Sequence, residues 1–421
     1  MGAPSGIRKF LGQLGPGVIT GASDDDPSGI ATYSQAGAAY RFDTLWTLLF
    51  SFPLMYAIQA ISARIGRTTG HGLATNLRRH YPGWLFYCIV APMAVANVIN
   101  IGADLAAMGD AAALLAGKHG KEAFTLGFGL LCLALILLVP YSRYANVLKW
   151  LTLSLFAYIA VLFTVQIPWG TVAQATLLPA MHLDSKYITV VVAILGTTIS
   201  PYLFFWQASQ EVEEIRKEPL RDPLIHAPEQ APAELSRIRI DTLVGMGFST
   251  VIAYCIMVST AATLNMHGVT DIQTTAQAAE ALRPVAGRFA FWLFAGGLIG
   301  TGLLGVPILA ASAAYGIAGT FRWKNSLEHK PLQAPQFYTA LALAILLGMA
   351  MNIVHIDPIK ALFWSAVING VVAVPVMWIL MLLSANRNAM GDFTVHGSLR
   401  WLGWLATLAM AAAVVAMFVF M

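Results

Sequence analysis

The chain has 421 residues, of which 57% are hydrophobic and only 11% are charged. A soluble domain usually carries about 25% charged residues, so this composition excludes an ordinary soluble protein, and the net charge of +4 forms no nucleic-acid-binding patch. Three cysteines, at 88, 132 and 255, lie in separate apolar segments and predict neither a disulfide framework nor a metal cluster.

Apolar segments long enough to cross a bilayer recur along the whole chain. We expect about eleven spans, at approximately 13–38, 43–63, 84–115, 122–140, 147–167, 187–207, 240–264, 287–318, 334–354, 359–384 and 398–420. The apolar runs are continuous rather than alternating, which favours helices over a closed barrel. The sequence therefore predicts an all-α polytopic membrane protein with a single transmembrane domain over residues 1–421.

The basic residues predict the orientation of these spans. If the N-terminus is cytoplasmic, 18 of the 25 lysine and arginine residues fall on the cytoplasmic side, as the positive-inside rule requires. The longest polar segment, 209–236, is then a cytoplasmic connection that we expect to be partly helical. We expect a multi-pass, monomeric protein of the cell membrane, such as a bacterial inner membrane, with the lipid bilayer as a partner and no nucleic acid.

Two spans contain a break at a similar place. The first reads GASDDDPSG over residues 21–29 and the sixth reads ILGTTISPY over residues 194–202, each with a proline that removes a helix hydrogen bond. The breaks lie five spans apart, which predicts two inverted repeats, at about 13–167 and 187–384, with 398–420 as an extra span. Discontinuous helices in matching positions are typical of secondary transporters; ordinary proline kinks are the alternative.

Asp24, Asp25 and Asp26 lie at the first break, where charge is costly. An aspartate at the bilayer centre costs about 2.5–3.5 kcal/mol on insertion scales, and neither broken span carries a lysine or arginine near its break. A bound cation is therefore the natural partner. Carboxylate, carbonyl and hydroxyl oxygens suit hard divalent ions such as Mg²⁺, Ca²⁺ or Mn²⁺.

Several motifs carry a resemblance to a known family. They are GPG at 15–17 followed by Asp26-Pro27, QAISARIGRTTGHGLA at 59–74, IGADLAAMG at 101–109, ILGTTISPY at 194–202, RIDT at 239–242 and MGDF at 390–393. With these motifs the chain resembles the NRAMP family of divalent metal transporters over nearly its whole length. The resemblance implies a LeuT-like fold of five plus five spans, with spans 1 and 6 broken, and transport by alternating access.

The resemblance also implies a metal site between the two breaks. Asp26 matches the family's metal-binding aspartate, and Thr197 stands where a backbone carbonyl binds the metal. Gly29 replaces the metal-binding asparagine and Ser200 replaces the metal-binding methionine, which is the soft ligand that favours transition metals. The sequence therefore looks closest to the NRAMP-related Mg²⁺ transporter branch. We expect a roomier, oxygen-lined site for a partly hydrated Mg²⁺, or Mn²⁺, with Asp24 and Asp25 adding negative charge around it.

The residues implied in proton coupling are also altered. Tyr202 and Gln207 stand where the family has two histidines, and Asp104 remains where the third span has an acidic pair, with Asn97 as a further polar candidate. We expect weak or no proton coupling.

The individual residues also have structural interpretations. Asp26 could serve only as a helix cap, the Thr197 and Ser200 hydroxyls could bond back to their own helix, and Gln207 could join two helices.

Three other functions stay open. A proton-coupled Mn²⁺ or Fe²⁺ symporter would share the fold, as would a sodium-coupled transporter of organic solutes, whose substrate carboxylate the aspartates would repel. An intramembrane aspartyl protease would need a carboxylate pair such as Asp26 and Asp104, but it gives the paired breaks no purpose. We therefore expect a transporter that is not an enzyme and needs no cofactor, with the ion as its substrate.

Overall fold

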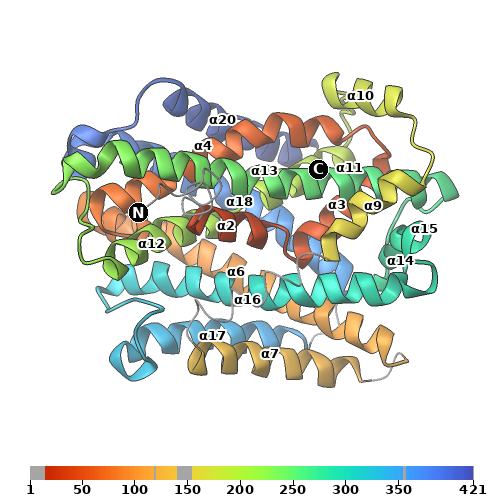
Figure 1. Cartoon of the computed structure of the whole chain (residues 1–421), viewed down its shortest axis with the longest axis horizontal. Coiled ribbons are helices and arrows are strands. Elements are labelled where there is room, and N and C mark those ends of the chain that lie inside the picture. Colours follow the sequence, from red (N-terminus) through yellow and green to blue (C-terminus); the bar gives the residue numbers. More distant parts are fainter. Residues whose placement is uncertain (1–14, 118–119, 140–153, 354–356, 421) are drawn as a thin grey trace, which may run out of the picture.

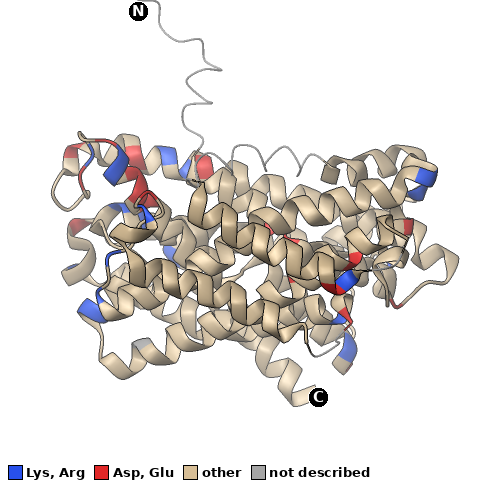
Figure 2. Ribbon diagram, turned by 90° about the horizontal axis from the view of Figure 1, so that it is seen from below, with Lys and Arg blue, Asp and Glu red and all other residues tan. Residues whose placement is uncertain are grey.

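The computed structural model describes residues 15–117, 120–139, 154–353 and 357–420, and within these ranges it contains helices and no strand. The long helices run side by side along one axis (Figure 1). Most lysine and arginine residues gather at the two ends of this bundle, and the helical walls between the ends are largely free of them (Figure 2). This distribution fits a body that crosses a membrane along its long axis, because charged side chains avoid the bilayer core.

Eight helical stretches among the described residues are long and apolar enough to cross a membrane, which confirms a multi-pass membrane protein. Seven of these stretches contain the long helices α4 (Leu45–Thr69), α6 (Gly83–Leu115), α7 (Lys121–Leu138), α13 (Ala231–Thr263), α16 (Ala290–Phe321), α18 (Pro358–Ala385) and α20 (Gly397–Phe420), and the eighth is Ser185–Lys217. Helix α17 (Pro335–Met351) is apolar but shorter. The structure describes the predicted fifth span, 147–167, only from residue 154 onward. Helix α9 (Phe156–Thr164) lies in this described part. The count of eleven spans and their sidedness stay predictions.

Both predicted helix breaks are present. The first span divides into α2 (Pro16–Asp24) and α3 (Pro27–Tyr40), and the sixth divides into α11 (Ser185–Thr198) and α12 (Pro201–Lys217). In each pair a proline is the first residue of the second helix, where its missing N–H and fixed φ cost little. The prolines thus end one helix and begin the next, rather than kinking a continuous one.

The broken helices pack against each other and against α13. Helix α12 packs on α2, α11 packs on α3, and α13 contacts both α2 and α3. Glycines permit the closest of these approaches: a Cβ atom at Gly21 would lie 2.1 Å from the Gly245 carbonyl oxygen of α13, and one at Gly245 would lie 2.0 Å from the Gly17 carbonyl oxygen. The backbones of α2 and α13 are therefore in direct contact.

The polar connection after the sixth span is shorter than the predicted 209–236, because α12 continues to Lys217 and α13 already begins at Ala231. The buried Glu211 carboxylate of α12 pairs with the Arg237 guanidinium of α13, and this ion pair joins the extended parts of the two helices. The described chain also contains short elements within connections: α5 (Leu73–His80), α10 (Trp169–Leu177), α14 (Thr275–Ala279), α15 (Arg283–Ala286), α19 (Arg387–Met390), and the 3-10 turns η2 (Pro228–Gln230), η3 (Asn265–His267), η4 (Glu280–Leu282), η5 (Gly287–Phe289), η6 (Pro331–Gln333) and η7 (Gly391–Phe393).

Candidate metal site

Asp26 lies at the break between α2 and α3 and is buried. Its Oδ1 accepts hydrogen bonds from the Ser28 hydroxyl at 2.5 Å and from the Gly29 N–H at 3.0 Å, so it caps α3. Its Oδ2 faces other helices and accepts from Asn100 Nδ2 at 3.1 Å and from the Tyr202 hydroxyl at 3.4 Å. Asp26 therefore combines the capping role with contacts to α6 and α12.

Asn100 links Asp26 to the acidic residue of α6. Its amide nitrogen also lies 3.4 Å from Asp104 Oδ2, and its carbonyl oxygen accepts a hydrogen bond from the Ser365 hydroxyl of α18 at 2.6 Å. The other oxygen of Asp104, Oδ1, is buried and has no hydrogen-bond partner among the described residues. The sequence interpretation did not select Asn100, although its four-residue spacing from Asp104 places both on one helix face.

Asp24 and Asp25 face α13 instead. The Ser249 hydroxyl lies 2.6 Å from Asp24 Oδ2 and 3.2 Å from Asp25 Oδ1, and its single proton can serve only one of them at a time. Asp24 Oδ1 and Asp25 Oδ2 are buried without a partner among the residues described. No lysine, arginine or histidine in the described chain forms an ion pair with either aspartate.

The end of α11 reaches the start of α3 at Gly29. A Cβ atom at this glycine would lie 3.1 Å from the Asp24 carbonyl oxygen and 3.2 Å from the Thr197 methyl carbon, so these groups pack closely against Gly29. The roomier site expected from the glycine is not present in this closed arrangement. The Thr197 hydroxyl is buried and has no hydrogen-bond partner in the described structure. The Ser200 hydroxyl, in the break before α12, bonds back to the end of α11, to the carbonyl oxygens of Gly196 at 2.7 Å and Thr197 at 2.8 Å. This is the alternative left open for Ser200.

The remaining candidates occupy different positions. Tyr202 lies within the site, where its hydroxyl also approaches the Ser23 carbonyl oxygen at 3.1 Å. Gln207 joins two helices through a hydrogen bond from the Thr20 hydroxyl of α2, and its amide nitrogen is buried without a partner in the part of the chain described. Asn97 donates to the Leu309 carbonyl oxygen of α16 at 2.9 Å, and none of its hydrogen bonds within the described structure reaches an aspartate.

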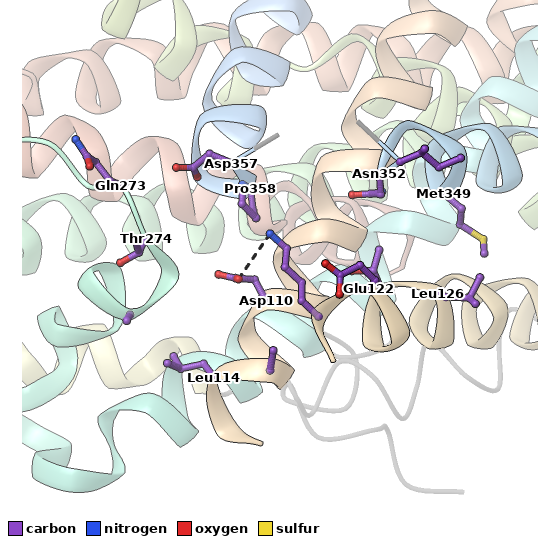
Figure 3. Close-up of a pocket in the computed structure, with 15 residues that line it drawn as sticks. Asp110, Leu114, Glu122, Leu126, Gln273, Thr274, Met349, Asn352, Asp357 and Pro358 are labelled. Atoms are coloured by element: carbon purple, nitrogen blue, oxygen red, sulfur yellow. Dashed lines mark ion pairs between the residues drawn. The ribbon is translucent and has the colours of Figure 1, made fainter. Parts of the chain in front are cut away.

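Asp24, Asp25 and Asp26 lie between two cavities at opposite ends of the bundle. One cavity, of about 880 Å³, is lined by Asp110, Glu122, Asp357 and the Lys121 side chain, whose nitrogen lies 3.7 Å from Asp110 Oδ1 (Figure 3). The other, of about 510 Å³, lies beside α5 and the ends of α12 and α16. None of the residues that line these cavities is one of the three aspartates, which are at most 1% exposed. The candidate site is closed from both ends.

The described residues contain no ready-made cluster of three or more histidine, cysteine, aspartate or glutamate side chains around one metal position. Ion binding here would therefore combine carboxylates with carbonyl and hydroxyl oxygens or with water, all of which are hard ligands. The unpartnered oxygens of Asp24, Asp25, Asp104 and Thr197 fit that chemistry.

A multi-pass helical protein with two interrupted helices around a closed acidic site belongs to the class of membrane transporters. The sequence of residues 17–420 matches the protein-family model for Nramp, which is described as natural resistance-associated macrophage protein-like. The chain belongs to the Nramp family. This is a family of transporters and not of enzymes, and it implies no cofactor.

Curated relatives and solved structures agree with this membership. The chain is 27% identical over 414 residues to the divalent metal cation transporter MntH of Deinococcus radiodurans, covering 96% of this chain and 88% of that protein. It is 25% identical over 411 residues to MntH of Caldanaerobacter subterraneus, with 92% and 88% covered. The fold is similar to that of a mutant of the Eremococcus coleocola manganese transporter, with a TM-score of 0.77, 17% identity and 99% and 88% covered. Mhp1, a nucleobase-cation-symport-1 transporter with the LeuT fold, gives 0.59 at 13% identity, with 97% and 90% covered.

Proposed function

We propose that this protein is a secondary transporter that imports a divalent metal cation by alternating access, with the ion held between the α2/α3 and α11/α12 breaks. The observation that carries the proposal is the burial of Asp24, Asp25 and Asp26 without a cationic side-chain partner in the described chain. At about 2.5–3.5 kcal/mol each on insertion scales, three charged aspartates would cost roughly 8–10 kcal/mol. A divalent cation would offset most of that cost, and the relatives named as divalent metal cation transporters support the substrate class.

The ligand chemistry supports Mg²⁺ as the preferred ion, as in the NRAMP-related Mg²⁺ transporters. The residues assigned to the site offer carboxylate, carbonyl, hydroxyl and amide groups, and Ser200 and Gly29 stand where the family has its metal-binding methionine and asparagine. Mg²⁺ prefers oxygen ligands and keeps several of its waters, whereas a soft sulfur ligand would select transition metals. We further propose that the ion is partly hydrated when it is transported and that Mn²⁺ is a second substrate.

We further propose that proton coupling is weak or absent and that the membrane potential drives uptake. Tyr202 and Gln207 occupy the positions at which the family has histidines, and both side chains form hydrogen bonds between helices. A divalent ion moving across the full potential gains about 4.6 kcal/mol per 100 mV, twice the value for a single charge. In this proposal the protein works as a monomer in the cell membrane with its N-terminus in the cytoplasm, and its two repeats are related by inverted topology.

A proton-coupled Mn²⁺ symporter is the second candidate. The manganese transporters among the similar structures favour it, and so does the hydrogen-bonded row from Asp26 through Asn100 to Asp104, which offers a second carboxylate to hold a proton. The two candidates differ in ion preference and in whether protons accompany the ion.

Purified protein in vesicles, with a metal indicator and a pH indicator inside, tests the proposal. We expect Mg²⁺ uptake that depends on an inside-negative potential, little change in internal pH, and Mn²⁺ uptake that excess Mg²⁺ suppresses. Asp26→Asn should abolish uptake of both ions, while Asp392→Asn, an exposed aspartate, should leave it unchanged. Mn²⁺ uptake that acidifies the vesicles and resists Mg²⁺ would establish the symporter instead, and normal uptake by Asp26→Asn would remove Asp26 from the mechanism.

A further inference from the structure

A cavity of about 510 Å³ at the predicted cytoplasmic end is basic, in contrast to the buried acidic site. Four arginines line it, Arg78, Arg79, Arg216 and Arg322, and its one acidic residue in the described chain is Glu213. A cavity of this size is within the range of small-molecule sites, about 300–1,000 Å³. Its positive charge makes it unsuitable for the transported cation, so it is a feature separate from the proposed metal pathway.

The charge of the cavity is not neutralised by its own glutamate. Glu213 already accepts hydrogen bonds from the Tyr315 hydroxyl at 3.0 Å and the Ser326 hydroxyl at 2.7 Å, and it pairs with Arg216 at 3.4 Å. Arg78 donates to the neutral carbonyl oxygen of Thr320. One of the four guanidinium groups thus has an acidic partner within the described chain.

The two other arginines are exposed at this cavity. Arg322 forms no ion pair with a described residue, and Arg79 contacts the His71 ring, at 3.4 Å from Nδ1. Burial lowers the pKa of His71 from its ordinary value, so this ring adds little positive charge near neutral pH. The positive charge of the cavity therefore comes from the arginines and is fixed, since guanidinium groups stay protonated.

Backbone donors converge on the same cavity. Helix α5 begins after Gly72 without a side-chain cap, and the N–H groups of Leu73 and Ala74, both of which line the cavity, have no hydrogen-bond partner among the described residues. The N-terminus of a helix favours an anion because its free N–H groups and its dipole both point there.

A buried hydroxyl provides an independent sign of a ligand. Ser209 of α12 is only 6% exposed and lines the cavity, yet its hydroxyl makes no hydrogen bond within the described structure. Its Oγ lies 3.0 Å from the position that a Cβ atom of Gly72 would take, so it is directed at the start of α5. The rest of this residue is buried and its Oγ is accessible from the cavity, so a partner for the hydroxyl would come from there.

We propose that this cavity binds a phosphate group, with the α5 N-terminus and the Ser209 hydroxyl at its base and the guanidinium groups of Arg79 and Arg322 at its mouth. Free N–H groups, a hydroxyl and planar guanidinium donors match the oxygens of a phosphate. The volume accommodates a nucleotide as well as inorganic phosphate. Because α12 and α16 both line the cavity, the ligand would tie the second half of a broken span to a neighbouring long helix and thereby regulate transport.

Binding measurements on the purified, metal-free full chain test this site without any transport assay, so its failure is distinct from failure of the proposed function. Inorganic phosphate, a nucleoside triphosphate and phosphatidic acid are added separately in detergent, and binding is followed by calorimetry and by the unfolding temperature. The double variant Arg79→Gln/Arg322→Gln should bind at least tenfold more weakly. The charge-matched control Arg387→Gln/Arg400→Gln, two arginines of α19 and α20 outside this cavity, should bind normally.

The outcomes separate the sources of the phosphate. Binding of a soluble phosphate assigns the site to a cytoplasmic anion, whereas binding of phosphatidic acid alone assigns it to a lipid headgroup. Ser209→Val should weaken the same binding while Thr250→Val, a hydroxyl bonded to its own helix, should not. Absence of binding for all three ligands, or equal loss in the arginine variant and its control, would overturn the proposal.

Discussion

Asp241 fixes the start of the first broken helix, and its substitution gives the sharpest test of how α2 is held. Its buried carboxylate on α13 accepts hydrogen bonds from three backbone N–H groups: Gly15 at 2.8 Å, Gly17 at 2.7 Å and Val18 at 3.1 Å. The start of α2 has no cap from its own side chains. A side chain of α13 therefore provides the cap that α2 lacks, and it does so only while the two helices are in contact.

The variant Asp241→Asn should loosen this contact by a calculable amount. An asparagine keeps one acceptor oxygen but puts an NH₂ group where the second oxygen accepted from Gly17, and it removes the negative charge. Losing one hydrogen bond to a charged acceptor costs about 1.5–3 kcal/mol. Since 1.4 kcal/mol corresponds to about a tenfold change in an equilibrium constant, the population with α2 separated from α13 should rise roughly ten- to hundredfold.

Cysteine labelling measures this population. Ser23, which is fully buried in the last turn of α2, is replaced by cysteine in a Cys88→Ser background, since Cys132 and Cys255 are buried. The rate of thiol modification should rise with the separated population when Asp241→Asn is added. The matched Asp392→Asn variant should leave the rate unchanged. An unchanged rate in Asp241→Asn would show that this cap does not hold α2, and that the glycine contacts alone do.

Two further variants probe the site itself. Gly29→Asn combined with Ser200→Met should move the Mg²⁺ to Mn²⁺ uptake ratio toward Mn²⁺ by about tenfold, because a soft thioether ligand is added; an unchanged ratio in the vesicle assay would contradict the role assigned to hard ligands. Asn100→Leu should destabilise the protein by about 1–3 kcal/mol, because the buried Asp26 loses a donor, and should lower uptake. Thermal unfolding and uptake measure these effects, with Asn97→Leu as the comparison; normal uptake by Asn100→Leu would exclude a part for this amide in the site.

The helix breaks could be predicted because their causes are local. Pro27 and Pro201 each remove a backbone donor at a fixed place in the sequence, and the structure confirms both as starts of new helices. The apolar runs likewise predicted the long helices to within a few residues at most of their ends. The start of α13 was missed, at Ala231 rather than 240, because its first turns carry charged residues whose partners lie on α4 and α12.

The partners of the aspartates could not be predicted in the same way. Helical periodicity does not predict which way a side chain points at a helix break. The sequence therefore does not show that Asp24 and Asp25 face Ser249 while Asp26 faces Asn100. The cap that Asp241 provides joins residues more than 220 positions apart. Such contacts depend on which helix faces meet, and a pattern within one segment contains no information on that.

The glycine contact between α2 and α13 has a consequence for motion. At Gly21 and Gly245 backbone lies against backbone, and the side chain nearest to Gly17 across the contact is that of Asp241. Helices that interlock through large side chains must repack many rotamers before they part, and each such rearrangement adds to the activation barrier. At these glycines α2 can leave α13 and return without repacking large side chains, so the rate at which the short helix departs is set there by polar contacts such as those of Asp241.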